Sequence, residues 1–136
     1  MSATATQPIS DSTVTVRPTI VTWFEIPTED FERAVHFYEA VFGIQLRREL
    51  EWPGMAIFPY QEPGISGCVF EGKNVKPSAN GVLVYLNCDN KLDAVLARLA
   101  GAGGAVLEKK NHIPGIGWVA QMRDSEGNRI GLHAVV

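Results

Sequence analysis

Glu25 and His133 are the ionisable side chains whose positions best suit acid–base chemistry in this sequence. Glu25 lies in a β-branched and aromatic run and His133 in the last apolar run, so both would project from predicted strands. Apolar surroundings would raise the pKa of Glu25, which would then be a general base, with His133 as its partner, or the anchor of a cationic ligand. The alternative is that the two side chains merely form a hydrogen bond at a strand edge.

Several large side chains in or beside predicted strands could together form a pocket with flat apolar walls for a planar ligand. They are Trp23, Trp52, Met55, Phe58, Tyr85 and Trp118. Asn87 lies on the same predicted strand face as Leu83 and Tyr85, where it would either orient a ligand or end the strand. Any one of these residues could instead pack in the core, but as a set they favour a pocket.

The first half of the chain must supply the elements that position these residues. A strand is predicted over residues 20–26, ending at Pro27. A helix capped by Thr28 follows, with apolar residues at helical spacing up to its stop at Gly43. Further strands are expected over residues 45–50, 55–60 and 66–71.

The second half repeats this order of elements. A strand over residues 81–88 leads into a helix capped by Asp89 or Asn90 and stopped by the glycines at 101–104. Strands then follow over residues 105–109, 118–123 and 129–136. We therefore predict an α+β fold of two tandem β-α-β-β-β modules, about residues 17–77 and 78–136, in one domain. Residues 1–16 are rich in Ser and Thr without periodicity and are expected to be a flexible N-terminal tail.

The composition excludes several classes of partner. Hydrophobic residues make up 46% of the chain, and a net charge of -3 without a basic run argues against nucleic acid as a partner. No apolar stretch approaches bilayer length and the N-terminus lacks the features of a secretory signal, so we expect no membrane association and a cytoplasmic protein. Cys68 and Cys88, each beside apolar residues, are predicted to be buried thiols in a reducing compartment.

Two motifs resemble the vicinal oxygen chelate superfamily, which includes glyoxalase I, bleomycin-resistance proteins and ring-cleaving dioxygenases. The first is Asp-Phe-Glu-Arg-Ala-Val-His-Phe-Tyr over residues 30–38, followed by Val-Phe-Gly at 41–43. The second is Asp-Ser-Glu-Gly-Asn-Arg-Ile over residues 124–130. The resemblance covers residues 20–136 and implies that the modules form an open, cupped mixed sheet around a cavity, often completed by a second copy of the chain. Because a fold of this kind hosts many reactions, it leaves the chemistry open.

The resemblance also implies where a divalent metal would be held. Alignment with the family pattern places Trp23, Leu83 and Gly131 at three ligand positions, and Gly67 or Cys68 at the fourth. Since Trp, Leu and Gly cannot ligate a metal through their side chains, we predict no metal or other cofactor. A shift of two residues on each strand would instead bring in three possible ligands, so a metal site stays an alternative; these ligands are Glu25, Tyr85 and His133.

Two functions follow from these features. The first is a homodimeric protein that binds a small planar or cationic molecule in the cup without a metal. The second is an enzyme of the superfamily, a lyase, isomerase or dioxygenase, with an atypical metal site or with Glu25 and His133 in acid–base roles. A module that mainly associates with itself or with another enzyme is a third possibility, because its sheet edges must be covered.

Overall fold

The predicted β-α-β-β-β order occurs twice in the computed structural model, which describes residues 19–136. The first module contains β1 (Trp23–Pro27), α1 (Phe31–Phe42), β2 (Arg47–Glu49), β3 (Trp52–Ile57) and β4 (Ser66–Phe70). The second contains β5 (Tyr85–Asn87), α2 (Leu92–Ala102), β6 (Ala105–Ile113), β7 (Gly117–Arg123) and β8 (Arg129–Ala134). The α+β fold class is thus confirmed, while the predicted tail over residues 1–16 lies outside the described residues.

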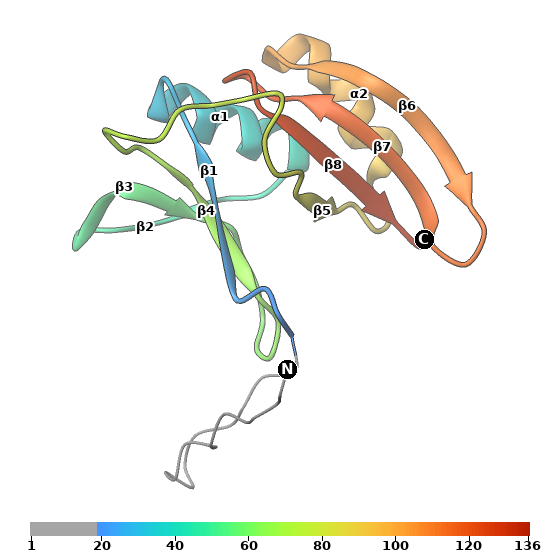
Figure 1. The fold of residues 1–136 in the computed structure, drawn as a ribbon, viewed down its shortest axis with the longest axis horizontal. Helices are drawn as coiled ribbons and strands as arrows, with labels where there is room; N and C mark the ends of the chain where they lie inside the picture. Colours follow the sequence, from blue (N-terminus) through green and yellow to red (C-terminus); the bar gives the residue numbers. More distant parts are fainter. Residues whose placement is uncertain (1–18) are drawn as a thin grey trace, which may run out of the picture.

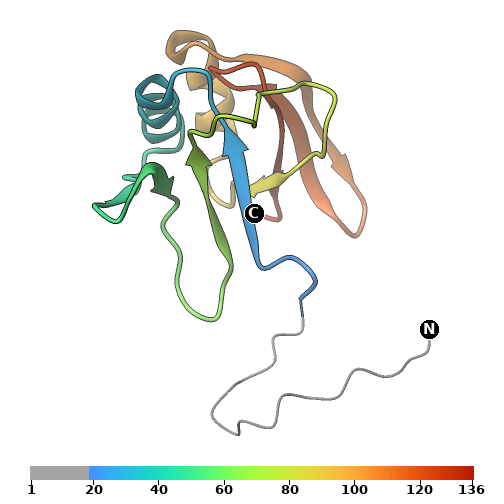
Figure 2. The same cartoon turned by 60° about the vertical axis from the view of Figure 1, so that its left-hand side comes forward.

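The strands form two four-stranded sheets rather than one hydrogen-bonded sheet. Their orders are β1-β4-β3-β2 and β5-β8-β7-β6. In each, the first and last strands of the module pair in parallel and the other pairs are antiparallel. The two helices lie side by side and join the modules (Figure 1), and Figure 2 shows β1 and β4 together in front of the second sheet.

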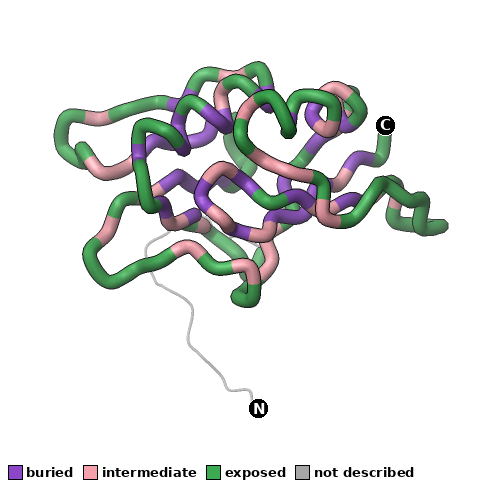
Figure 3. The backbone as a smooth tube through the Cα atoms, turned by 90° about the horizontal axis from the view of Figure 1, so that it is seen from above, coloured by how far each residue is buried: buried purple, intermediate pink, exposed green. Residues whose placement is uncertain are grey.

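Each sheet has one face against the helices, here called its helix face, and an opposite outer face. Along β1 the side chains alternate, so that Ile26 is buried on the helix face whereas Trp23 and Glu25 are exposed on the outer face. One core cluster contains residues from both helices and both helix faces. In Figure 3 the buried stretches of backbone accordingly lie inside the molecule and the exposed stretches lie mostly in its peripheral loops.

The helices have the predicted extents but not the predicted N-terminal caps. Asp30 caps α1 by accepting a hydrogen bond from the Arg33 N–H at 3.0 Å, while Thr28 donates its hydroxyl proton to the Phe70 carbonyl instead. The cap position of α2 is Lys91, which makes no side-chain capping bond. Asp89 instead accepts a hydrogen bond from the Val135 N–H. Thr28 and Asp89 do not cap their helices because each side chain bonds a residue distant in sequence, and Asn90, the other predicted cap, lies before the observed cap position Lys91.

The stop at Gly43 is confirmed, since this residue adopts φ 66°, which glycine reaches without steric cost. The second helix likewise ends at Gly103, within the predicted glycine run. Neither helix of the described residues is long and apolar enough to cross a membrane.

Glu126, in the turn between β7 and β8, joins the second module to the start of α1. Its Oε1 accepts hydrogen bonds from the backbone N–H groups of Glu29 and Asp30 at 2.9 and 2.7 Å. The Arg33 guanidinium donates to both carboxylate oxygens. Burial alone would raise the pKa of Glu126, but these hydrogen bonds, the Arg33 bond foremost, lower it to about 2. A carboxylate of one module thus occupies the positive end of the other module's helix.

Asp124 forms a second, fully buried link between the modules. It accepts a hydrogen bond from the Tyr38 hydroxyl at 2.6 Å, and from the N–H groups of Glu126 and Asn128 at 2.9 Å. Burial, and then the Asp124 charge, raise the pKa of Tyr38 well above its usual value, so the phenol remains the donor. The Asp-Ser-Glu-Gly-Asn motif is therefore a structural link between the modules.

Candidate functional site

An apolar cavity of about 550 Å³ lies between the two modules. Its walls come from the start of β1, the C-terminal end of α1, the connection between β3 and β4, and the segment that leads into β5. The principal apolar residues are Phe24, Phe42, Ile44, Phe58, Leu83 and Leu86. A space of this size suits a small organic molecule.

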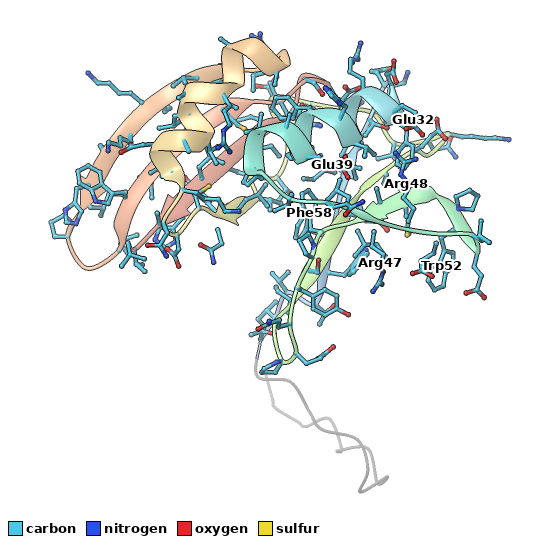
Figure 4. The ribbon with its side chains drawn as sticks, turned by 180° about the vertical axis from the view of Figure 1, so that it is seen from behind. Glu32, Glu39, Arg47, Arg48, Trp52 and Phe58 are labelled. Carbon is cyan, nitrogen blue, oxygen red and sulfur yellow. The ribbon has the colours of Figure 1, made fainter. Side chains whose placement is uncertain are left out.

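Packing against the core holds two aromatic rings of the cavity wall in place. The rings of Phe24 and Phe58 lie 5.7 Å apart between centroids, and Phe58 meets the Tyr38 ring edge-on at 5.4 Å. Figure 4 shows Phe58 on the α1 side of the first sheet. Phe58, one of the residues predicted to line a pocket, lies in the wall of this cavity, which is on the helix face.

The polar groups of the cavity are few and mostly provide donors. Ser66 Oγ already donates to the Phe58 carbonyl at 2.7 Å. Asn87 Oδ1 accepts from the Asp89 N–H at 2.8 Å, a bond that leaves the Nδ2 hydrogens for other partners. Lys91 Nζ donates to the Phe42 carbonyl at 3.2 Å and lies 5.6 Å from the centroid of the Phe42 ring. Of the described side chains that line the cavity, Lys91 alone is charged.

The outer face of the first sheet carries Trp23, Glu25 and Met55. Glu25 is the cross-strand neighbour of Cys68, and its Oε2 accepts a hydrogen bond from Trp23 Nε1 at 3.3 Å. Cys68 is fully buried, and its burial, followed by the charge of Glu25, raises the thiol pKa to about 12. Cys68 is therefore a protonated, inert thiol at neutral pH.

The outer face of the second sheet carries Tyr85, Asn87 and His133. Asn87 and His133 are cross-strand neighbours, and His133 Nε2 lies 2.7 Å from the Ile116 carbonyl oxygen, which can only accept a hydrogen bond. Glu25 is on the other sheet and bonds Trp23, so within the described residues the predicted pairing of Glu25 with His133 does not form.

The predicted aromatic set is not gathered into one pocket. Trp118 is the cross-strand neighbour of buried Ala134 and therefore lies on the helix face, where Lys110 Nζ is 4.8 Å from its ring centroid. Trp52 belongs to the β2–β3 hairpin, on the side away from α1 together with Arg47 (Figure 4). Of the predicted set, Phe58, Tyr85 and Asn87 belong to the cavity lining, but the side chains of Tyr85 and Asn87 are on the outer face of β5.

The side chains at the expected ligand positions do not fit a catalytic divalent metal. Within residues 19–136, no three His, Cys, Asp or Glu side chains come close enough together to hold an ion. The Tyr85 ring occupies the space over Gly131, so that even a methyl group there would collide with it. Leu83 lines the apolar cavity, and the raised pKa of Cys68 disfavours the thiolate that a metal requires.

Sequence reasoning missed Lys91, Phe42 and Ile44 as cavity residues. Phe42 is the last apolar residue at helical spacing before Gly43, and in the structure it is both a core residue and part of the cavity wall. Lys91 left one signal in the sequence: it stands at the helix start, where Ser, Thr, Asp or Asn is usual.

The chain was also compared with known proteins. The model of the Glyoxalase/Bleomycin resistance protein/Dioxygenase superfamily matches residues 20–132. A glyoxalase/bleomycin resistance protein from Albidiferax ferrireducens superposes with a TM-score of 0.68 at 19% identity, covering 85% of this chain and 98% of the other. No curated protein matches.

Two further solved structures have names that refer to glyoxalase chemistry. Lactoylglutathione lyase from Agrobacterium tumefaciens gives a TM-score of 0.57 at 17% identity, over 86% of this chain and 94% of that one. A mutant of glyoxalase I from Zea mays gives 0.63 at 22% identity, over 84% of this chain and 45% of that one. At these identities the likeness shows the fold alone.

Proposed function

Because the chain belongs to the Glyoxalase/Bleomycin resistance protein/Dioxygenase superfamily, whose fold does not fix one reaction, we propose a function from the site itself. The protein binds a small, planar, largely apolar molecule in the cavity between its modules, and it does so without a metal ion. The observation that carries this proposal is the cavity of about 550 Å³ with its wall of phenylalanine rings.

Ring-lined walls favour a planar ligand because aromatic faces and edges pack well against one another. The cationic ligand considered from the sequence depended on Glu25 as its anchor. Glu25 does not line the cavity, and the charged group that does is Lys91. The proposed ligand is therefore planar and apolar, without a positive charge.

The alternative, an enzyme that uses Glu25 and His133 as base and acid, has less support. A candidate acid and base must reach the same substrate within hydrogen-bond distance or through one water molecule. Here Glu25 and His133 lie on different sheets and each has its own partner, Trp23 and the Ile116 carbonyl. Binding is thus the function that the geometry supports best.

The test is calorimetric titration of the whole protein with naphthylmethanol, a neutral planar probe. In the Leu83→Trp variant the new indole would fill part of the cavity, because Leu83 is a half-buried wall residue. We expect its affinity for the probe to fall at least about tenfold, or about 1.4 kcal/mol. Val106→Trp is the matched control, since Val106 is a partly exposed residue of β6 away from the cavity.

If the wild type and Leu83→Trp bind the probe equally well, the probe binds outside the cavity. No measurable binding by the wild type at millimolar probe would refute the proposed function. A thermal melt of each variant shows whether a loss of affinity comes from a loss of fold.

We also propose that two copies of the chain associate and that the protein works in the cytoplasm. Trp23, Tyr85 and Trp52 are 40%, 47% and 53% exposed, and large exposed apolar side chains often mark an interface. Sedimentation analysis of the wild type beside Trp23→Glu tests this association: a dimer that the substitution weakens is expected, and a wild-type monomer would refute it. The free buried thiols Cys68 and Cys88 fit a reducing compartment.

A further inference from the structure

We propose that the ligand of this cavity carries a negatively charged head group, a carboxylate on a planar apolar body, and that Lys91 selects it. The inference rests on the proposed function, because it assigns a ligand class to the same cavity. It names Lys91 as the specificity-determining residue.

The charge of the cavity supports this assignment. Its other walls are apolar or neutral, and no carboxylate of the described residues lines it. An apolar wall strengthens the interaction between Lys91 and an anion because it excludes water. A cation in the same place would meet the Lys91 charge, and no carboxylate of the described lining residues would compensate it.

The hydrogen-bond donors of the cavity also favour an anionic ligand. Lys91 Nζ has three hydrogens, and in the described part of the chain one bond, to the Phe42 carbonyl, is formed. Asn87 also lines the cavity, but its side chain is on the outer face of β5 and its oxygen already accepts from the Asp89 N–H, so Lys91 is the residue that supplies donors to a ligand. A carboxylate has two acceptor oxygens and no donors, and therefore complements the remaining hydrogens of the Lys91 ammonium group.

Lys91 also has a structural role that any test must separate from ligand binding. Its bond to Phe42 places a positive charge at the C-terminal end of α1, where the helix dipole is negative. Arg98 does the same through a bond of 3.1 Å from Nη1 to the Val41 carbonyl, but Arg98 does not line the cavity. Arg98 is therefore a matched control that shares the structural role alone.

The experiment compares naphthoate with naphthylmethanol, probes with the same ring system and different charge, by calorimetry at neutral pH. Because Lys91 can form a charged hydrogen bond with the carboxylate, we expect the wild type to bind naphthoate about 10- to 100-fold more tightly than naphthylmethanol. Lys91→Met, which keeps the aliphatic stem, should lose this preference but still bind naphthylmethanol. Arg98→Met should keep the preference, and Lys91→Arg should retain most of it.

Each outcome bears on the inference. If the wild type binds both probes equally, or if Lys91→Met keeps the preference for naphthoate, the assignment of an anionic ligand is wrong and the cavity-binding function still stands. If the wild type binds neither probe, the proposed function falls and the inference with it. Should Lys91→Met fail to fold, the comparison of the two probes on the wild type, and the weakening of naphthoate binding by salt, still decide the question.

Discussion

Replacing Glu126 by Gln is expected to destabilise the fold by about 3 kcal/mol at neutral pH, and by progressively less in acid. The carboxylate side chain is fully buried and accepts hydrogen bonds from Arg33 and from the N–H groups of Glu29 and Asp30. Its pKa falls from an ordinary 4.5 to about 2. One pKa unit corresponds to about 1.36 kcal/mol, so a pKa lowered by about 2.5 corresponds to a loss of about 3 kcal/mol in the free energy of unfolding.

The direction of the pH dependence follows from the lowered pKa. A carboxylate with a lowered pKa in the folded state stabilises the protein above its unfolded value of 4.5, and this contribution disappears as the pH falls towards about 2. The glutamine side chain of the variant cannot ionise, so the difference in unfolding free energy between wild type and variant should shrink across that interval. Arg33 is half exposed and can be solvated in the variant, so no unpaired buried charge enlarges the effect.

The assay is urea unfolding followed by circular dichroism at several pH values from neutral to acid. Glu108→Gln is the matched control, because Glu108 is an exposed residue of β6 and should change stability by less than about 0.5 kcal/mol. A Glu126→Gln variant as stable as the control at neutral pH, or a difference from the wild type that does not change with pH, would contradict the reasoning.

Three further predictions concern the core. Tyr38→Phe removes the phenol that donates to buried Asp124, and should cost about 1.5–3 kcal/mol in urea unfolding; a cost below about 0.5 kcal/mol would show that the bond contributes little. Gly67→Ala places a methyl group against the carbonyl and ring of Phe24 and should cost about 1–3 kcal/mol, so unchanged stability would contradict this packing. Cys68, with a pKa of about 12 and no exposed surface, should react with a thiol reagent at mildly alkaline pH only after unfolding; labelling of the native protein at the unfolded rate would refute its burial.

The elements could be predicted because their signals are local. The apolar stripe that ends at Phe42 and Gly43 has helical spacing, and the buried residues of α1 follow it. The capping side chains could not be predicted, because Thr28 and Asp89 bond partners that become neighbours only through sheet pairing. Local composition contains no information about such contacts.

The candidate site was predicted less well, for two physical reasons. Met55 and Phe58 were assigned to one pocket although a spacing of three residues along a strand puts side chains on opposite faces, and the structure has them on opposite faces. The cavity itself lies between modules, where Phe24, Ile44 and Leu83 come together from segments far apart in sequence. Strand alternation predicts which face a residue occupies, but not which faces of two modules approach each other.

Charged side chains of the second module bond both ends of α1, whose C-terminal end forms part of the cavity wall. Glu126 accepts hydrogen bonds at the N-terminal end, while Lys91 and Arg98 donate to carbonyls at the C-terminal end, where α1 has no basic residue of its own in its last turn. Because the modules are joined at both ends of one helix, we expect these bonds to limit their relative motion and so to lower the cost of ordering the cavity when a ligand binds. The same contacts hold Lys91 beside the Phe42 wall, so the residue that joins the modules is also the one placed to select a ligand.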